Sequence, residues 1–398
     1  MENLYKTFYQ LLSRTNVDFV RYLYPKINWK NRLIAITGAR GTGKTTMILQ
    51  HIKKNFGEAP KEVLYVSLDN IYFSNNRLLD LAHNFEQMGG KHLFLDEVHK
   101  YDNWSVELKN IYDSLPDLKV VFTGSSMLEI YREKADLSRR TTHYTLNGLY
   151  FREFLLYEKG LDFPVLKLEE LLENHLSIAS QINKQMKPLP LFQQYLKEGF
   201  YPYYKEDSEI YADRLKHTVN VILENDLPVI ESIEYLTIKK IKQLLYVIAQ
   251  RVPFSPNIKE LSEILGVSRK SLLTYLIYLE KAQLIGLLQQ DVSGLRTLTK
   301  PEKIYLDNTN LAYALEAEKP DLGNIRETFF FNQLKIVSKV ISGGKPDFKI
   351  NNKYSIEVGG KNKGHEQIIG IENAYLALDN LEYGFMNTIP LWLFGMLY

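Results

Sequence analysis

Apolar runs of about five residues recur in the first third of the chain, and segments with helix-like spacing of apolar residues separate them. The runs are Leu33–Thr37, Val63–Ser67, His92–Asp96 and Lys119–Thr123. A short continuous apolar run is typical of a strand that is buried on both faces. Strands that alternate with helices predict a parallel sheet covered by helices, and we expect about five strands in it. The predicted fold class of this part is α/β.

The hydrophobic pattern changes several times after this part. From residue 151 to about residue 236 apolar residues recur at helical spacing, with a break at Lys187–Pro190, and the apolar end Ile389–Tyr398 is expected to close a core as a strand or a helix. The predicted divisions are a helical lead-in (1–30), an α/β domain (31–155), a helical lid (156–236), a winged-helix-like module (237–299) and a mixed α/β domain (300–398).

Composition narrows the classes of function. A chain of 398 residues is too long for one core, so several domains are expected. The formal net charge of +2 gives no general attraction for polyanions, so any nucleic-acid site must be local. The absence of cysteine excludes disulfides and zinc–thiolate sites and is compatible with a cytoplasmic location. We expect no signal peptide and no membrane span, because no run reaches roughly 20 apolar residues.

The segment between the first strand and the next helix carries the most specific motif, G-x-x-x-x-G-K-[ST]. Glycines let a backbone wrap phosphate oxygens, and the amides at a helix start point at the anion. Lys44 is expected to reach the β- and γ-phosphates of ATP, and the Thr45 hydroxyl to bind Mg²⁺. The alternative is an ordinary tight turn. The predicted nucleotide-binding residues are Gly38, Ala39, Arg40, Gly41, Thr42, Gly43, Lys44, Thr45 and Thr46.

A second motif follows the third apolar run, which ends in Asp96 and Glu97. Ligands of parallel sheets collect at the carboxyl ends of strands, so we expect this pair beside the glycine loop. Asp96 is predicted to hold Mg²⁺, and Glu97 to activate the water that attacks the γ-phosphate. The alternative is an acidic helix cap.

Smaller signals come after the fourth run. Ser125 and Ser126 are candidates for a sensor of the γ-phosphate, with a helix cap as the alternative. Arg139 and Arg140 are candidates for an arginine that stabilises the transition state, in its own chain or in a neighbouring subunit.

These motifs together resemble the bacterial and archaeal AAA-type (STAND-related) P-loop ATPases. The resemblance covers residues 30–155 and rests on the glycine loop, Asp-Glu-Val-His-Lys-Tyr-Asp-Asn-Trp104, Phe-Thr-Gly-Ser-Ser126 and Ser-Arg-Arg140. It implies ATP and Mg²⁺ as cofactors, ATP hydrolysis as the activity and self-association as a common feature. It names a class of mechanism and not a pathway.

The stretch from Asn257 reads as two helices joined by a turn at Gly266, with Ser268 capping the second helix. Strands at 284–288 and 295–299 would form a hairpin beside them. As a DNA-binding element it would bring Lys259, Arg269 and Lys270 near phosphates or bases. The second helix offers few donors for base edges, so a packed structural module is the alternative.

The last hundred residues carry a scattered acidic pattern. Asp347 is followed by a strand with Glu357 and, four residues later, Lys361, and Glu327 lies in a preceding helix. This arrangement resembles the restriction-endonuclease-like domain of unknown function that often follows such ATPases, in which two carboxylates bind Mg²⁺ and a lysine helps to activate water. Here glycines occupy 359 and 360, so Lys361 lies further along the strand than the usual lysine. The alternatives are a half-buried edge strand and a degenerate nuclease fold that only binds.

Three functions remain open at this point. The leading prediction is an ATP-binding, Mg²⁺-dependent ATPase whose nucleotide state controls the winged-helix-like and nuclease-like parts. The second is a nucleotide-gated switch that binds DNA or a protein partner with negligible turnover. The third is a DNA nuclease licensed by ATP.

Overall fold

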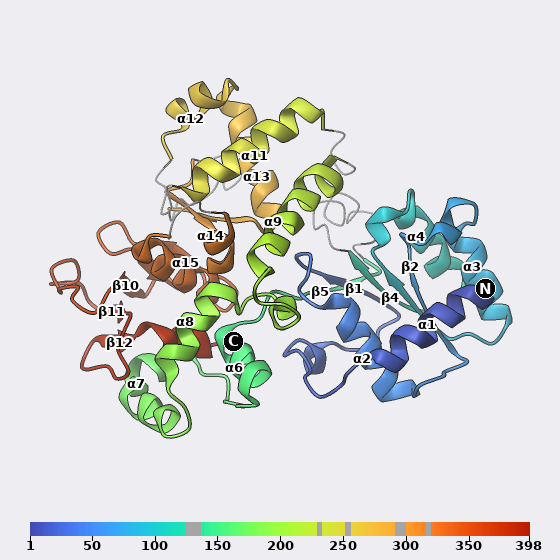
Figure 1. Cartoon of the computed structure of the whole chain (residues 1–398), viewed down its shortest axis with the longest axis horizontal. Coiled ribbons are helices and arrows are strands. Elements are labelled where there is room, and N and C mark those ends of the chain that lie inside the picture. Colours follow the sequence, from blue (N-terminus) through green and yellow to red (C-terminus); the bar gives the residue numbers. More distant parts are fainter. Residues whose placement is uncertain (125–136, 138, 229–232, 251–255, 291–299, 316–319) are drawn as a thin grey trace. The chain divides into compact units, whose positions relative to one another are not determined.

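The computed structural model describes residues 1–124, 137, 139–228, 233–250, 256–290, 300–315 and 320–398 (Figure 1). The chain forms two compact units, Met1–Gly148 and Leu149–Tyr398. The finer predicted division of the second unit stays a prediction.

The first unit is built on a parallel sheet with strand order β2-β3-β4-β1-β5. Its four predicted strands are confirmed, and a fifth joins them at the edge. The strands are β1 (Leu33–Thr37), β2 (Val63–Ser67), β3 (His92–Asp96), β4 (Lys119–Gly124) and β5 (Thr142–Thr145). The helices are α1 (Glu2–Arg14), α2 (Lys44–Phe56), α3 (Leu78–Gln87) and α4 (Trp104–Ser114), and short 3-10 turns lie at η1 (Tyr24–Lys26), η2 (Ile71–Ser74) and η3 (Val98–Lys100). This is the predicted P-loop NTPase α/β fold.

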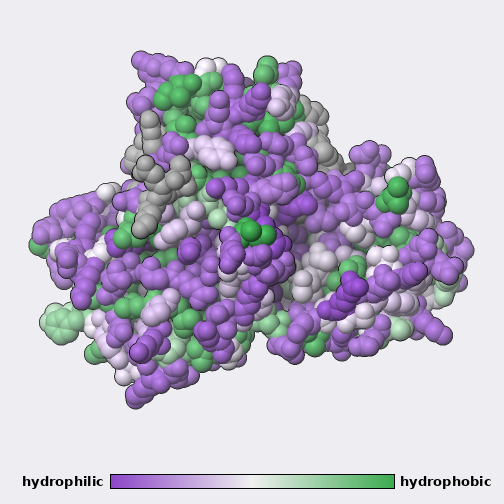
Figure 2. Space-filling view, viewed as in Figure 1, coloured by the Kyte–Doolittle hydropathy of each residue, from purple (hydrophilic) through white to green (hydrophobic). Residues whose placement is uncertain are grey.

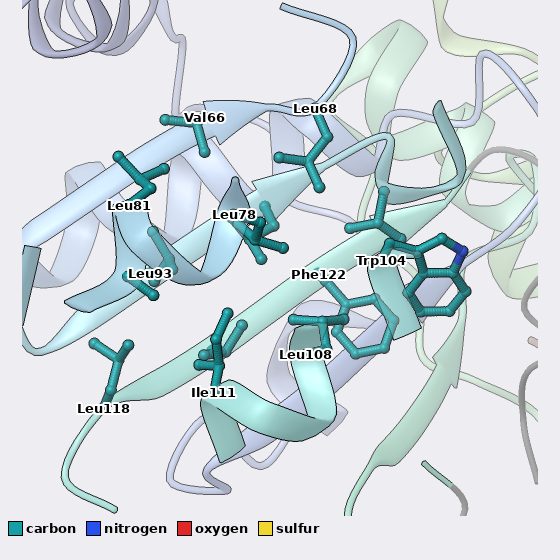
Figure 3. Packing of buried hydrophobic residues seen from close by; sticks show 14 of the residues in the cluster. Val66, Leu68, Leu78, Leu81, Leu93, Trp104, Leu108, Ile111, Leu118 and Phe122 are labelled. Atoms are coloured by element: carbon teal, nitrogen blue, oxygen red, sulfur yellow. The ribbon is translucent and has the colours of Figure 1, made fainter. Parts of the chain in front are cut away.

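Helices cover both faces of this sheet, because alternate strand residues point to opposite sides. Leu33 and Ala35 of β1 face the core that contains α3 and α4, which Figure 3 shows from close by. Ile34 and Ile36 face the core that contains α2 and most of the buried residues of α1. A strand buried on both faces must be apolar throughout, which explains the continuous apolar runs.

The second unit begins with helices and ends with a mixed sheet. The helices are α6 (Phe151–Lys159), α7 (Leu168–Asn183), α8 (Pro188–Glu198), η4 (Pro202–Lys205), α9 (Tyr211–Val221), η5 (Ile222–Asp226), α11 (Tyr235–Ala249), α12 (Ile258–Leu265), α13 (Arg269–Lys281), α14 (Thr309–Leu315), α15 (Leu322–Leu334) and η6 (Leu391–Met396). The strands are β6 (Ile285–Leu288), β7 (Lys303–Leu306), β8 (Val340–Ser342), β9 (Phe348–Ile350), β10 (Tyr354–Gly359), β11 (Ala374–Leu378) and β12 (Thr388–Pro390). The predicted break at Lys187–Pro190 is confirmed, because α8 begins there.

The larger sheet has the order β12-β11-β10-β9-β8, antiparallel on one side of β10 and parallel on the other. The first strand predicted for the hairpin is present as β6, and its antiparallel partner is β7, which starts at Lys303. The second predicted strand, 295–299, lies outside the described residues. The apolar end of the chain does close a core: η6 is buried, and Phe394 contacts Phe330 of α15.

No helix among the described residues is long and apolar enough to cross a bilayer. On the face drawn in Figure 2, hydrophobic side chains lie in small groups among hydrophilic ones. Scattered exposed apolar residues of this kind are normal for a folded surface.

Acid should weaken the first unit through His51. Its ring stacks on Trp29 with centroids 3.7 Å apart. Burial, and then the neighbouring His92, lower the pKa of His51 from 6.5 to about 4. Between these two pH values the unfolded chain binds the proton more readily than the folded one, so the free energy of unfolding should fall as the pH falls from about 6.5 to about 4.

The variant His51→Phe keeps the stack but removes the titrating group. Its stability, measured by urea unfolding at a series of pH values, should fall less steeply than that of the wild type over this range. His92, whose pKa burial also lowers, accounts for part of the slope that remains. An equal slope in both proteins would contradict the role given to His51.

Candidate functional site

The glycine loop connects β1 to α2 with three glycines in the left-handed half of backbone space. Gly38, Gly41 and Gly43 have φ values of 148°, 84° and 93°. A Cβ atom on Gly38 would lie 2.0 Å from the carbonyl oxygen of Leu146, so no other residue fits there. The loop thus follows the path that the motif predicts and delivers the first turn of α2 to the carboxyl edge of the sheet.

Lys44 is the first residue of α2 and is buried. Its Nζ donates to the carbonyl oxygens of Gly38 and Ala39, both at 2.9 Å. The ammonium therefore lies inside the curve of the loop. Arg40 is half-buried and Thr46 is exposed in the same segment.

Asp96, at the carboxyl end of β3, is the centre of a hydrogen-bond network. Its Oδ2 accepts from the Thr45 hydroxyl at 2.5 Å and from the Tyr65 hydroxyl at 2.7 Å. Its Oδ1 accepts from the Thr123 hydroxyl and from the backbone N–H of Glu97 at 3.1 Å. Burial, reinforced by the charge of Asp96, raises the pKa of Tyr65, so this phenol stays a donor.

Glu97 follows in a strained backbone conformation, with φ of 53°. Its backbone N–H also donates to the Thr123 hydroxyl at 3.1 Å, and its Oε2 lies 3.4 Å from Nε2 of His99. The side chain is 21% exposed, which leaves the carboxylate within reach of water. Strain of about 1–3 kcal/mol is usual where a residue is held for function.

Besides Tyr65, which donates to Asp96, two residues of this site escaped the sequence prediction. Thr123 joins Asp96 to Glu97, and its only sequence signal is a hydroxyl near the carboxyl end of the next strand. The second is Arg21, a buried arginine from the segment after α1. Its guanidinium donates to the carbonyl oxygen of Thr42 in the glycine loop, and to those of Asn147 and Gly148 at 2.7 and 3.0 Å. Arg21 thus holds the loop to the segment that follows β5.

The remaining candidates of the first unit have different outcomes. Ser125 and Ser126 lie outside the described residues. Arg139 is exposed, and Arg140 donates to both oxygens of Asp113 at 3.0 and 3.1 Å. Both arginines precede β5 and so lie at the amino edge of the sheet, opposite the glycine loop. Action on the nucleotide of the same chain does not fit this placement, and action on a neighbouring subunit stays a prediction.

The residues at the carboxyl edge suit ATP and Mg²⁺. The glycine loop presents backbone amides and a lysine to an anion. Thr45 and Asp96 bring two oxygen ligands together, and hard divalent cations prefer oxygen.

Comparison with known families agrees with this geometry. Residues 30–155 match the family described as AAA domain. Most of this match lies in the first unit, which is therefore similar to an AAA-type domain. Residues 189–322 match a domain of unknown function (DUF8612).

Two relatives come from the archaeon Methanocaldococcus jannaschii. The chain is 28% identical to uncharacterized protein MJ1637, over 74% of this chain and 66% of that protein. It is 26% identical to uncharacterized protein MJ1544, over 77% of this chain and 67% of that protein. The chain thus spans about two thirds of the length of these relatives.

Solved structures overlap with the chain at low scores. The AMPPCP-bound DnaA from Aquifex aeolicus has a TM-score of 0.25 and 17% identity, over 69% of this chain and 86% of that one. C. elegans PCH-2 has a TM-score of 0.24 and 16% identity, over 44% and 48%. The fold assignment therefore rests on the strand order and glycine loop of this chain.

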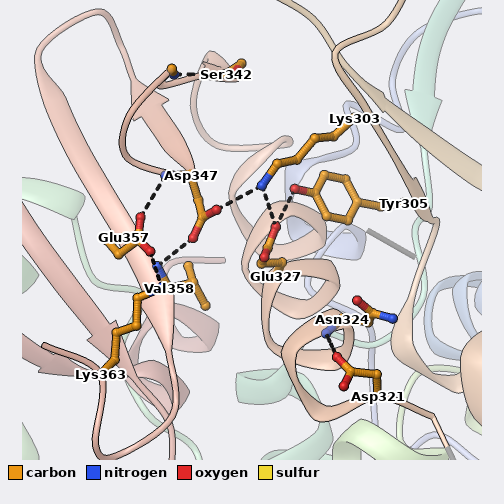
Figure 4. Close-up of polar contacts among 11 residues, drawn as sticks. Lys303, Tyr305, Asp321, Asn324, Glu327, Ser342, Asp347, Glu357, Val358 and Lys363 are labelled. Atoms are coloured by element: carbon orange, nitrogen blue, oxygen red, sulfur yellow. Dashed lines mark hydrogen bonds and ion pairs between the residues drawn. The ribbon is translucent and has the colours of Figure 1, made fainter. Parts of the chain in front are cut away.

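A second cluster of charged residues lies in the second unit (Figure 4). Glu327 of α15, Asp347 before β9 and Glu357 of β10 come together, as the acidic pattern predicts. Lysines lie among these carboxylates: Nζ of Lys303 is 3.0 Å from Glu327 and 2.8 Å from Asp347. Among the described residues, no group of three or more His, Asp and Glu side chains is arranged to hold a metal ion.

The lysine predicted for this cluster is replaced by another. Lys361 is exposed, and Lys363 instead contacts Glu357 at 2.5 Å. Strand β10 ends at Gly359, and the N–H of Lys363 donates to the carbonyl oxygen of Gly360 at 2.9 Å. This turn ends the strand alternation that placed Lys361 on the face of Glu357.

The candidate DNA contacts are all exposed. Lys259 lies on α12, and Arg269 and Lys270 begin α13. The predicted turn and cap are confirmed, because Gly266 has φ of 58° and Ser268 Oγ accepts from the N–H of Ser271 at 3.0 Å. Further along α13, Leu272, Tyr275, Leu276 and Leu279 are buried. Base reading by this helix stays a prediction.

Replacing Arg21 with methionine should destabilise the first unit and weaken nucleotide binding. Three carbonyl groups lose a charged donor, and bonds of this kind contribute about 1.5–3 kcal/mol each. Contributions of bonds made by one side chain do not add fully, so we expect the free energy of unfolding to fall by about 2–4 kcal/mol and ATP affinity to fall about tenfold or more. Urea unfolding and titration with a fluorescent ATP analogue measure the two effects.

The control is Arg21→Lys, which keeps the charge but lacks the planar fork that reaches several carbonyls at once. It should lie between the wild type and the methionine variant. A lysine variant equal to the wild type in both assays would show that the fork is not needed.

Proposed function

We propose that the chain is an ATP-binding, Mg²⁺-dependent ATPase whose nucleotide state controls its second unit. The observation that supports this most directly is the network around Asp96, which gathers Thr45, Thr123 and Glu97 beside the glycine loop and Lys44. The motif, the strand order and the AAA domain match all agree with ATP as the ligand.

Each residue has a defined part in this proposal. Lys44 binds the β- and γ-phosphates of ATP, and the backbone amides of the loop bind the α- and β-phosphates. Thr45 and Asp96 would hold Mg²⁺, which supplies charge for the leaving phosphate. Glu97 accepts a proton from the attacking water, and Thr123 holds the backbone of Glu97 in place.

A specific observation favours the alternative of a switch with negligible turnover. Glu97 Oε2 lies 3.4 Å from Nε2 of His99, and a carboxylate engaged by a neighbour activates water less readily. In that alternative ATP sets the conformation of the chain, and binding of DNA or a protein partner is the output. Both proposals allow a second copy of the chain to complete the nucleotide site, because AAA-type sites often lie between subunits.

Two substitutions test the nucleotide site. Lys44→Ala should abolish tight ATP binding, because Lys44 supplies the positive charge inside the curve of the glycine loop. Glu97→Gln should keep ATP binding but lower turnover by about 100-fold or more, the usual contribution of a general base. Binding is measured with a fluorescent ATP analogue, and turnover by phosphate release with and without DNA.

The outcomes separate the alternatives. Micromolar affinity retained by Lys44→Ala would remove the proposed phosphate site, and unchanged turnover in Glu97→Gln would remove Glu97 from its role. Binding without turnover in the wild type would favour the switch. His99→Ala would then show whether the histidine restrains Glu97, because release of the carboxylate should raise turnover.

A further inference from the structure

The carboxylates of the second unit are the residues from which a divalent-metal site is usually built. Glu327, Asp347 and Glu357 come from α15, the segment before β9 and β10, and Figure 4 shows them facing one another. Carboxylates brought this close repel each other, so the fold must supply a positive charge. A metal ion is one source of that charge, and a lysine is another.

Lys303 occupies the space between two of these carboxylates. It projects from β7, and Nζ lies 3.0 Å from Oε2 of Glu327 and 2.8 Å from Oδ1 of Asp347. Tyr305, two residues along the same strand, donates its hydroxyl to the same oxygen of Glu327 at 2.8 Å. Burial opposes charge on Lys303, but Glu327 and Asp347 outweigh it and raise its pKa. The lysine is therefore held as a cation.

The third carboxylate is engaged in the same way. Nζ of Lys363 lies 2.5 Å from Oε1 of Glu357, and the backbone N–H of Asp347 donates to Oε2 at 3.1 Å. With its amide oriented to satisfy both of its groups, Gln367 donates to the two oxygens of Glu357 at 2.8 and 2.7 Å. The other oxygen of Asp347, Oδ2, accepts from the N–H of Val358 at 3.1 Å. The oxygens that face one another already have donors.

Gly359 is needed for this arrangement. A Cβ atom there would lie 2.7 Å from both Cβ and Cγ of Lys363. Glycine therefore leaves room for the stem of Lys363 to lie across the end of β10 and return to Glu357. Strand β10 ends at Gly359, so Lys361 lies beyond the strand, and the same glycine leaves room for Lys363 to contact Glu357.

We infer that Lys303 and Lys363 take the place of metal ions in this cluster, and that it is closed to divalent cations while both lysines are in place. A metal ion would have to expel a half-buried ammonium from two carboxylates and leave it without a counter-charge. The cluster then joins β7, α15 and the sheet through fixed ion pairs, and no metal-dependent cleavage follows from it. This inference is independent of the nucleotide site.

The test is a titration of the full-length protein with Mn²⁺ in the absence of nucleotide. The electron paramagnetic resonance signal of free Mn²⁺ measures how much is bound. The wild type and Asp347→Asn should bind the same amount, because the cluster binds none in either protein. Lys303→Met should gain one Mn²⁺ site, whose affinity for Mn²⁺ is at least tenfold higher than any that the wild-type protein shows at this cluster. The double variant Lys303→Met with Asp347→Asn should lose that site again, and Lys303→Arg, which keeps the charge, should not gain it.

Two results would overturn the inference. One is a saturable Mn²⁺ site in the wild type that Asp347→Asn abolishes, which would make the cluster a metal site as it stands. The other is a folded Lys303→Met variant without added Mn²⁺ affinity. If Lys303→Met does not fold, Lys363→Met tests the same point at Glu357: a gained Mn²⁺ site that Glu357→Gln removes supports the inference, and no gain overturns it.

Discussion

The arrangement of the first unit depends on one buried carboxylate, Asp96, whose oxygens must accept hydrogen bonds from other elements. Asp96 is 2% exposed, and a carboxyl group buried this deeply is costly unless its oxygens are hydrogen-bonded. Its donors come from three other elements: Thr45 from α2, Tyr65 from β2 and Thr123 from β4. Only the order β2-β3-β4, with α2 starting at the same edge, brings them together. The chemistry of the site and the topology of the sheet are therefore one constraint.

The same constraint explains why the strands and the glycine loop of the first unit could be predicted from local sequence patterns. The strands are buried on both faces, so their apolar runs are continuous, and the glycine loop is contiguous along the chain. Lys44, Thr45 and Asp96 could be placed near one another because motif spacing and the carboxyl-edge rule need no knowledge of side-chain packing. The second unit has fewer such rules. Local patterns predicted its mixed character, its buried end, the helix break at Lys187–Pro190 and the turn at Gly266, but not the strand that pairs with β6 or the lysine that contacts Glu357.

The residues that were missed act over long distances or after a change of chain direction. Arg21 meets carbonyls more than a hundred residues away, at Asn147 and Gly148, and no local pattern marks a buried arginine in a loop. Lys363 was missed because strand alternation was extended past Gly359, where the chain turns. Strand alternation is a sound guide only while the strand lasts.

The two acidic centres of the chain solve the problem of buried charge in opposite ways. Asp96 is satisfied by hydroxyl groups and a backbone amide, which are neutral. A neutral donor such as Thr45 can turn and present its oxygen to a cation, and the cation then supplies charge that the site lacked. At Asp347 and Glu327 the donors include an ammonium, which has already supplied that charge. Exchanging it for a metal ion gains little attraction and leaves a lysine to be solvated, so carboxylates alone are a poor guide to metal binding. The identity of their donors, hydroxyl or ammonium, decides whether a buried acidic group is prepared for a cation or replaces one.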